Sequence, residues 1–249
     1  MDVLAHPLLS ARFFPPRPAF LLDACFVEVP GARLACWRAG GVPIVLFFHS
    51  NGETADDARR EIGAELLRMG VGVFVAEQRG TGSSTGRQTF PALLDDAHAI
   101  LAAAGVPPER VVAFGRSIGS LAAIELAASH RLAGLVLESG IADVGERIRA
   151  HAKADELGTS DAELDAAIAA RFNHAAKLAR HTAPILVLAS GRDERIDRAH
   201  AARLAIWAGS ADKELIVFNR GRHHEVFDEN RPAYLRALRG FLARVAPAS

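Results

Sequence analysis

Residues 115–119 read Gly-Arg-Ser-Ile-Gly, and their serine is the side chain best placed in the sequence to do chemistry. Four apolar residues, 111–114, precede this motif, and an Ala-rich stretch with helical character follows it. A buried strand, a sharp turn and a helix would expose the Ser117 hydroxyl at the edge of a sheet, beside the free N–H groups of a helix N-terminus. Gly115 and Gly119 would let backbone approach backbone there. The pattern predicts that Ser117 is a nucleophile.

An acid and a base follow later apolar runs of the chain. Asp193 comes after one such run, and His223 comes after the next, just past a glycine. In this order Asp193 is predicted to orient the imidazole of His223, which accepts the serine proton. His224 is adjacent and is the alternative base. Glu138 is an alternative acid, although a buried structural carboxylate is the favoured interpretation.

Two backbone N–H groups are predicted to stabilise the charge that develops on a substrate carbonyl. The loop His49-Ser50-Asn51-Gly52 follows an apolar strand, residues 43–48, and Asn51 is the predicted donor from it. Ile118, the residue after the nucleophile, is the predicted second donor. A plain turn also suits Asn and Gly. His49 is interpreted as a structural residue at the end of the strand.

Two other kinds of site were considered. Residues 80–86 are glycine-rich, but they lack Gly-Lys-Ser/Thr and the G-x-G-x-x-G spacing, so a tight connecting loop is favoured over a nucleotide-binding loop. The run His223-His224-Glu225 lacks the His-Glu-x-x-His spacing that places two imidazoles on one helix face. No metal and no organic cofactor is therefore expected.

Composition restricts the class of protein. The chain has 249 residues, half of them hydrophobic, which argues against disorder for most of its length. Lys plus Arg and Asp plus Glu number 29 each, so no basic excess indicates a nucleic-acid partner. Cys25 and Cys36 are interpreted as buried small hydrophobic residues on neighbouring strands. The prolines after residue 14 interrupt the only apolar region near the start, so we expect no membrane span and a cytoplasmic location.

Apolar runs alternate with helical patterns along most of the chain. This alternation predicts one α/β domain over residues 1–249, with a mostly parallel eight-stranded sheet covered by helices on both faces. Residues 1–23 are predicted to be an irregular lead-in, because Pro15, Pro16 and Pro18 disfavour a helix. Residues 141–181 are too long for one crossover helix and predict a short helical lid. The predicted strands are residues 24–29, 33–38, 43–48, 71–76, 111–114, 133–137, 184–189 and 214–218.

These motifs resemble those of the α/β-hydrolase superfamily and, within it, the Bem46-like serine hydrolases. That group has His-Gly-Asn, Arg-Gly-x-Gly-x-Ser-x-Gly, Gly-x-Ser-[Ile/Leu]-Gly, Gly-x-Asp and Gly-x-His in this order. The chain has His49-Ser50-Asn51, a glycine loop one residue longer, the motif around Ser117, and the glycine-preceded Asp193 and His223. Ser50 replaces the usual glycine, and its Cβ predicts a narrower loop or altered backbone angles.

The resemblance implies a serine hydrolase that cleaves a carboxylic ester or thioester of a small acyl compound through an acyl-enzyme on Ser117. A peptidase or amidase with the same three residues is one alternative. A non-catalytic binding protein on the same fold is another, because Ser50 departs from the family pattern in the oxyanion loop. Chain length, leaving group and oligomeric state are left open by the sequence.

Overall fold

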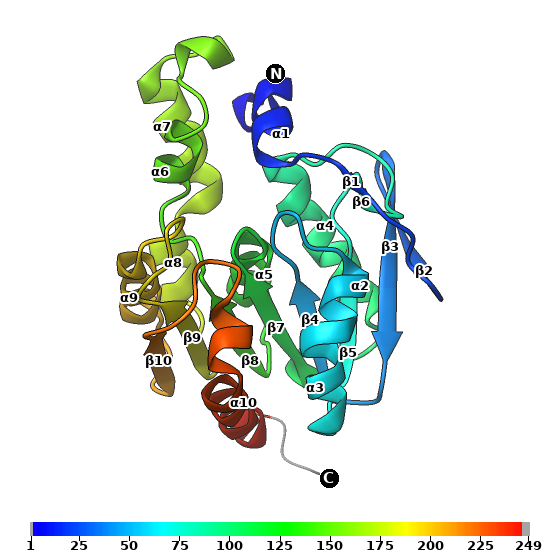
Figure 1. Ribbon diagram of the computed structural model, residues 1–249. Helices are drawn as coiled ribbons and strands as arrows, with labels where there is room; N and C mark the ends of the chain where they lie inside the picture. The colour runs from blue at the N-terminus through cyan, green and yellow to red at the C-terminus, as the bar shows by residue number, and fades with distance from the viewer. Residues whose placement is uncertain (1, 246–249) are drawn as a thin grey trace.

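Eight strands of the computed structural model, which describes residues 2–245, form one sheet (Figure 1). In space they follow the order β10-β9-β8-β7-β4-β5-β3-β2, and the neighbours from β10 to β5 are parallel whereas β3 runs antiparallel to β5 and β2. Their bounds are β2 (Cys25–Val29), β3 (Ala32–Ala39), β4 (Ile44–Phe48), β5 (Gly72–Ala76), β7 (Val111–Arg116), β8 (Gly134–Glu138), β9 (Ile185–Ser190) and β10 (Lys213–Phe218). The predicted α/β-hydrolase fold, with its mostly parallel eight-stranded sheet, is confirmed.

Helices cover both faces of this sheet. The α-helices are α1 (Pro7–Phe13), α2 (Ala55–Ala58), α3 (Ala64–Arg68), α4 (Phe90–Ala103), α5 (Gly119–Ser129), α6 (Val144–Arg149), α7 (Asp161–Phe172), α8 (His174–Ala179), α9 (Arg198–Trp207) and α10 (Val226–Val245). Shorter turns are η1 (Val3–Ala5), η2 (Arg59–Gly63, a π turn between α2 and α3), η3 (Pro108–Arg110) and η4 (Asp155–Leu157). Apart from the main sheet, β1 (Arg17–Pro18) pairs with β6 (Thr81–Gly82).

The central strand β4 shows why its sequence is apolar at every position. Ile44, Leu46 and Phe48 belong to the core that includes residues of α4, α5, α8 and α9. Val45 and Phe47 belong to the core on the opposite face, with residues of α2, α3 and α10. Because side chains alternate between faces and both faces are covered, a continuous apolar run is required.

The N-terminal segment corrects the prediction of an irregular lead-in over residues 1–23. Residues Pro7–Phe13 form α1, and His6 caps it by accepting a hydrogen bond from the N–H of Leu8 at 3.2 Å. Pro7 occupies the first turn, where its missing N–H costs no helical hydrogen bond. The later prolines follow the helix instead of preventing it, so the prediction was wrong for residues 7–13.

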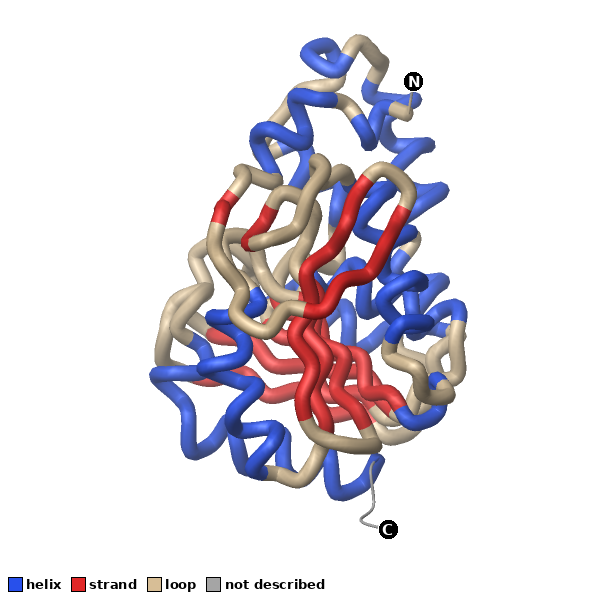
Figure 2. Tube along the Cα trace, turned by 90° about the vertical axis from the view of Figure 1, so that its right-hand side faces the viewer, coloured by secondary structure: helices blue, strands red, loops and turns tan. Residues whose placement is uncertain are grey.

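Residues 141–181 form a chain of short helices, α6, η4, α7 and α8, instead of one long helix. In Figures 1 and 2, α6 and α7 rise above the sheet at the end where β4, β7 and β8 terminate, and α1 lies beside them. Phe172 of α7 packs edge-on against Phe90 of α4, with ring centroids 5.8 Å apart, and Leu164 is fully buried. This segment therefore shares its core with the sheet-bearing part of the molecule.

The two cysteines differ from one another, which corrects a second prediction. Cys36 of β3 is buried, as expected, but its neighbour Cys25 is exposed because it begins the edge strand β2. Both thiols are free.

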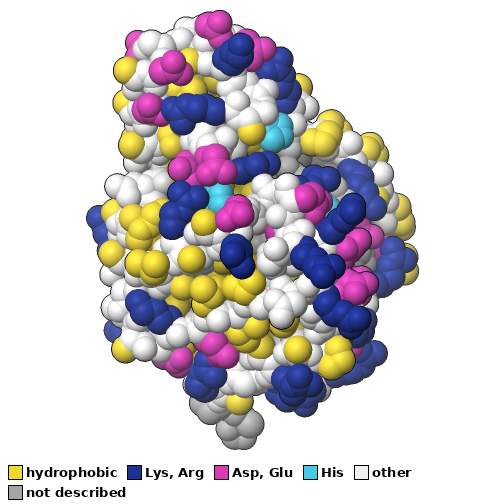
Figure 3. All heavy atoms as spheres, turned by 60° about the vertical axis from the view of Figure 1, so that its left-hand side comes forward, with side chains coloured by type: hydrophobic (Ala, Val, Ile, Leu, Met, Phe, Trp, Pro, Cys, Tyr) yellow, Lys and Arg dark blue, Asp and Glu magenta, His cyan; other side chains and the backbone are white. Residues whose placement is uncertain are grey.

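Charged side chains of both signs lie close together on one face of the molecule (Figure 3). On the face shown in Figure 3, basic and acidic side chains are intermingled and apolar side chains lie between them. Among residues 2–245, no helix combines the length and the apolar character needed to cross a bilayer.

Candidate active site

Ser117, Asp193 and His223 form one chain of hydrogen bonds beyond the carboxyl ends of β7, β9 and β10. The Oγ of Ser117 lies 2.9 Å from Nε2 of His223, and Nδ1 of the same ring lies 2.8 Å from a carboxylate oxygen of Asp193. When Nδ1–H donates to Asp193, Nε2 presents its lone pair to Ser117 and can accept the hydroxyl proton. The structure thus brings together the predicted nucleophile, base and acid.

The turn at Ser117 is a strained strand-to-helix elbow. Its φ of +53° lies in the left-handed region that residues with a Cβ seldom occupy. A Cβ on Gly115 would come within 2.5 Å of the Cα of Ser120, and one on Gly119 within 2.1 Å of the carbonyl oxygen of Phe48. Glycine is required on both sides of the serine because β7, α5 and the end of β4 approach so closely.

Asn51 and Ile118 line the pocket that contains Ser117. Neither of their backbone N–H groups donates to a backbone carbonyl elsewhere in residues 2–245. The Asn51 side chain is held instead, because its Nδ2 donates to the carbonyl oxygen of Phe13 at 2.6 Å. Both predicted donors therefore line the same pocket as the serine.

His49 fixes the loop that carries Asn51. Its Nδ1–H donates to the carbonyl oxygen of Ser50 at 2.8 Å, and its Nε2 accepts the backbone N–H of Gln78 at 3.0 Å. The side chain of Gln78 donates to the carbonyl oxygen of His49 at 3.0 Å. Burial is the main cause that lowers the pKa of His49, so the ring is neutral and holds a single tautomer. These contacts fit the structural role expected for His49.

Ser50, the residue that replaces glycine, does not strain this loop. It is not among the residues of the described chain with a positive φ. Its backbone N–H and its hydroxyl both donate to one carboxylate oxygen of Glu53, at 2.9 and 3.1 Å. The hydroxyl therefore adds a hydrogen bond that glycine lacks, and the carboxylate of Glu53 clamps the loop.

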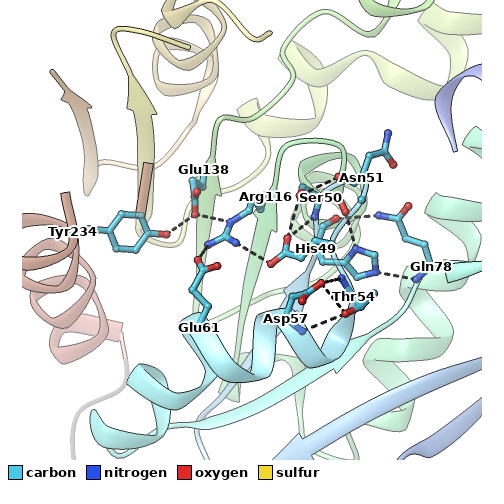
Figure 4. Close-up of polar contacts among 12 residues, drawn as sticks. His49, Ser50, Asn51, Thr54, Asp57, Glu61, Gln78, Arg116, Glu138 and Tyr234 are labelled. Carbon is cyan, nitrogen blue, oxygen red and sulfur yellow. Dashed lines mark hydrogen bonds and ion pairs between the residues drawn. The ribbon is translucent and has the colours of Figure 1, made fainter. Parts of the chain in front are cut away.

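The same carboxylate connects the loop to a buried arginine directly before the nucleophile (Figure 4). Arg116 donates to Glu53 at 2.8 Å, to Glu61 at 3.0 Å and to Glu138 at 3.0 Å, and Tyr234 of α10 also donates to Glu138. Burial alone lowers the pKa of Arg116, but the three carboxylates raise it well above its ordinary value, so the guanidinium stays charged. Glu138 is committed to this cluster and is not the acid that faces His223.

The environment of Asp193 favours its ionised form. Burial alone raises the pKa of Asp193, but the hydrogen bond and charge of His223 and the backbone N–H groups of Ile196 and Arg195 together lower it below its ordinary value. Those amides donate to the second carboxylate oxygen at 2.8 and 2.9 Å. The aspartate is thus a fixed acceptor for the imidazole N–H.

His224 lies beside the hydrogen-bonded trio and is not in it. Its ring packs edge-on against that of His223, with centroids 4.8 Å apart, and it lines the pocket. Burial, followed by the charges of His223 and Arg195, lowers the pKa of His224. Of the two adjacent histidines, His223 makes the hydrogen bond to Ser117.

Comparison with known proteins shows which proteins this chain resembles. A hydrolase family model described as serine aminopeptidase, S33, matches residues 42–164. An uncharacterized protein of Mycobacterium tuberculosis is 29% identical over 226 residues, which cover 87% of this chain and 77% of that protein. The human alpha/beta hydrolase domain-containing protein 17B is 27% identical over 222 residues, covering 86% of this chain and 72% of that protein. The chain is similar to α/β-hydrolase proteins over most of its length and has their fold.

Solved structures resemble this chain along most of its length. An esterase from Pyrococcus furiosus superposes with a TM-score of 0.73 at 18% identity, over 93% of this chain and 98% of that one. A monoacylglycerol lipase from Paleococcus ferrophilus superposes with a TM-score of 0.68 at 18% identity, over 86% and 99% of the two chains. At this level of identity the likeness shows a shared fold.

The glycine-rich loop of this chain is filled by one of the chain's own side chains. A carboxylate oxygen of Glu77 accepts the backbone N–H of Ser83 at 2.7 Å, and the other accepts that of Ala55 at 3.2 Å. Gly82, with φ +57°, passes so close that a Cβ would lie 2.0 Å from this carboxylate. The loop packs around Glu77, as a tight connection does, and this carboxylate takes the amide of Ser83 that a phosphate would need. Within residues 2–245, no group of three or more His, Cys, Asp or Glu side chains is arranged to hold a metal ion.

A pocket of about 180 Å³ opens above Ser117, and several of its walls were not anticipated. They come from α1 and the residues after it, from the segment predicted as a lid, and from the loop after β9. These additional lining residues are Arg12, Phe13, Pro15, Ile141, Arg147, His151, Arg195 and Ile196. The apolar spacing of Leu8, Leu9 and Phe13 after Pro7 signals a helix in the sequence. No sequence signal places that helix at the pocket.

Proposed function

We propose that this protein is a serine hydrolase that cleaves a carboxylic ester or thioester through an acyl-enzyme on Ser117. The observation that carries the proposal is the unbroken hydrogen-bond chain from Ser117 through His223 to Asp193, facing one pocket. The match to a hydrolase family model and the esterase and lipase among its structural neighbours support it. Its sequence motifs favour the Bem46-like subgroup, a small-molecule acyl substrate and a cytoplasmic location.

Each residue has a defined role in the proposed reaction. Nε2 of His223 takes the proton of Ser117 as Oγ attacks the carbonyl carbon, and Asp193 stabilises the resulting imidazolium. The N–H groups of Asn51 and Ile118 bind the oxyanion. When the intermediate collapses, the bond to the leaving group breaks and that group takes the proton from His223. Water then gives a proton to His223 as its oxygen attacks the acyl carbon. When this second intermediate collapses, the bond to Oγ breaks, Oγ takes the proton back from His223, and the acid is released.

Labelling with a fluorophosphonate probe tests this proposal. The wild type is expected to be labelled and Ser117→Ala is not, with circular dichroism checking that both are folded. Ser139→Ala is the matched control, because Ser139 is also buried, follows the neighbouring strand β8 and has a positive φ of 45°. This control is expected to label like the wild type. A folded wild type that does not label contradicts the proposal and favours a non-catalytic binding protein.

A peptidase or amidase is the second candidate, because the matching family model is described as a serine aminopeptidase. The same three residues serve amide cleavage, in which His223 must protonate an amine leaving group. Comparing kcat/KM for an aminoacyl 4-nitroanilide and for a 4-nitrophenyl ester separates the two functions. Faster turnover of the anilide, corrected for the intrinsic reactivity of each substrate, would favour the peptidase.

A further inference from the structure

The pocket above Ser117 has a one-sided charge. Among the described residues, its lining contains three arginines and three histidines but no aspartate or glutamate. This contrasts with the mixed charges on the face shown in Figure 3. A cavity lined by basic groups of one sign raises the local concentration of anions.

One of the three arginines is already neutralised. Arg12 of α1 makes a bidentate ion pair with Glu156, with distances of 2.8 and 3.1 Å, and it donates to the carbonyl oxygen of His151 at 2.6 Å. Its hydrogen bonds are therefore used to join α1 to the segment 141–181. Arg12 shapes the wall of the pocket more than it charges it.

Arg147 and Arg195 have little compensation. Arg147, on α6, donates at 3.0 Å to the backbone carbonyl of Arg195, and no carboxylate in residues 2–245 forms an ion pair with it. The guanidinium of Arg195 forms an ion pair with the carboxylate of Glu194, at 3.7 Å, which also accepts the backbone N–H of His223 at 3.1 Å. Two arginines, one on α6 and one in the loop after β9, are thus joined at the pocket, and among the described residues Glu194 is the one carboxylate that forms an ion pair with either of them.

We propose that the substrate carries a carboxylate or phosphate group and that Arg147 and Arg195 bind it. This inference rests on the proposed function and names the substrate class for that site. Planar guanidinium groups match both anions because they can donate two parallel hydrogen bonds to neighbouring oxygens.

The dimensions of the site restrict where this anion lies. The pocket at Ser117 is smaller than the roughly 300–1,000 Å³ of typical ligand pockets, so it fits a short acyl group. A second, more open hollow beside it shares Pro15, Asn51, Arg195 and His224 with the first. The other charged residues that line this hollow are Arg17, Arg116, Glu53, Asp57 and Glu61. Arg195 therefore stands where a short reacting group in the pocket continues into a larger polar part outside it.

Two pairs of esters, each matched except for one charge, test the proposal. Monomethyl adipate against dimethyl adipate places the anion on the acyl side. 3-Carboxyphenyl acetate against its methyl ester, 3-(methoxycarbonyl)phenyl acetate, places it on the leaving group. For the wild type we expect kcat/KM to favour the anionic member of at least one pair by about tenfold or more, consistent with one hydrogen bond to a charged group.

Arg147→Gln and Arg195→Gln are each expected to lower that preference about tenfold. The preference is a ratio of two kcat/KM values, so the intrinsic reactivities of the two esters cancel when the variants are compared with the wild type. Arg149→Gln is the matched control, since Arg149 is also on α6 but pairs with Asp165 and does not line the pocket. A wild type that prefers the neutral member of both pairs overturns the inference. So does an unchanged preference in both pocket variants.

Failure of this inference can be told apart from failure of the proposed function. Fluorophosphonate labelling of Ser117 without any preference for anionic esters leaves a serine hydrolase of neutral substrates. If Ser117 is not labelled, calorimetric titration with monomethyl adipate still decides the inference. Binding that weakens at least tenfold in Arg147→Gln supports the anion site, whereas no binding, or equal binding by wild type and variant, overturns it.

Discussion

The carboxylate of Asp193 fixes which nitrogen of His223 carries the proton. Asp193→Asn replaces the acceptor by an amide that can donate to Nδ1, which would turn the lone pair of the ring away from Ser117. We expect kcat/KM for a 4-nitrophenyl ester to fall by about 10⁴-fold with little change in fold. Circular dichroism checks the fold. A loss below about tenfold would mean that Asp193 does not set the tautomer.

At this scale, the chain order of the motifs carried most of the information in the sequence. Ser117, Asp193 and His223 could be predicted because each follows an apolar run, and the carboxyl ends of parallel strands meet at one edge. The ion cluster of Arg116 could not, because its partners Glu53 and Tyr234 are far away in the sequence. No spacing rule links a residue of an elbow to a tyrosine on the last helix.

The cluster around Arg116 joins the oxyanion loop, strand β7 and helix α10, so its effects belong to these elements together. Glu53→Gln removes one charge from a buried pair and weakens the acceptor for Ser50, and we expect unfolding to become easier by about 3 kcal/mol. Glu61→Gln is the control, because it removes a carboxylate from the same arginine but 30% of its side chain is exposed. Urea unfolding measures both. An equal loss in the two variants would show that burial of the Glu53 pair has no special effect.

The start of the segment 141–181 is held by a buried histidine that titrates on acidification. His174 donates from Nδ1 to the carbonyl oxygen of Ile141 at 2.9 Å, and burial, then the charge of Lys177, lowers the pKa of His174 to about 4. The unfolded chain binds this proton near pH 6.5 whereas the folded chain binds it only near 4. Stability is therefore complete above about pH 6.5 and declines as the pH falls to 4, by about 3 kcal/mol in total.

His174→Asn isolates this contribution, because an asparagine amide can keep the donor to Ile141 but cannot titrate. Urea unfolding between pH 7 and 4 is expected to show a shallower decline for the variant than for the wild type. Parallel declines would assign the acid sensitivity to other groups.

The helix α1 and the division of residues 141–181 into short helices show what could not be predicted from the sequence at the scale of elements. The prolines of residues 15–18 led to the prediction of an irregular segment, although residues 7–13 carry a short amphipathic helical pattern. The positions where one helix ends and the next begins in residues 141–181 depend on packing against the sheet, which the sequence does not display.

The whole molecule is expected to unfold as one unit, because the rings of Phe90 and Phe172 join the segment 141–181 to the core beneath it. Trp37 on β3 and Trp207 on α9 lie toward opposite ends of the sheet and provide one reporter for each end. In Trp207→Phe and in Trp37→Phe, the fluorescence of the remaining tryptophan and far-UV circular dichroism should give the same urea midpoint. Midpoints that differ within one variant would reveal a part that unfolds separately, and would contradict the prediction of a single domain.

The architecture at this scale followed from alternation in the sequence, since the strands with two covered faces are apolar runs, with a polar residue only at the last position of β7, β8 and β9. The contribution of α1 to the wall of the pocket could not be predicted from the sequence, because α1 is near the start of the chain and the residues that it meets there come much later. Arg12 and Phe13 meet residues of the segment 141–181 more than 130 positions away.

The carboxylate of Glu77 inside the glycine-rich loop has a consequence for how new activities can arise on this scaffold. The loop has the left-handed glycines and inward amide of an anion receptor, but the receptor is occupied by a ligand that is covalently part of the chain. The carboxylate of Glu77 therefore occupies the position that a free anion would take. Replacing Glu77 by glycine or alanine would leave a cavity that the backbone N–H groups of Ser83 and Ala55 already face, and formate or acetate could bind in it. One substitution would thus replace a structural side chain by a binding site for small anions.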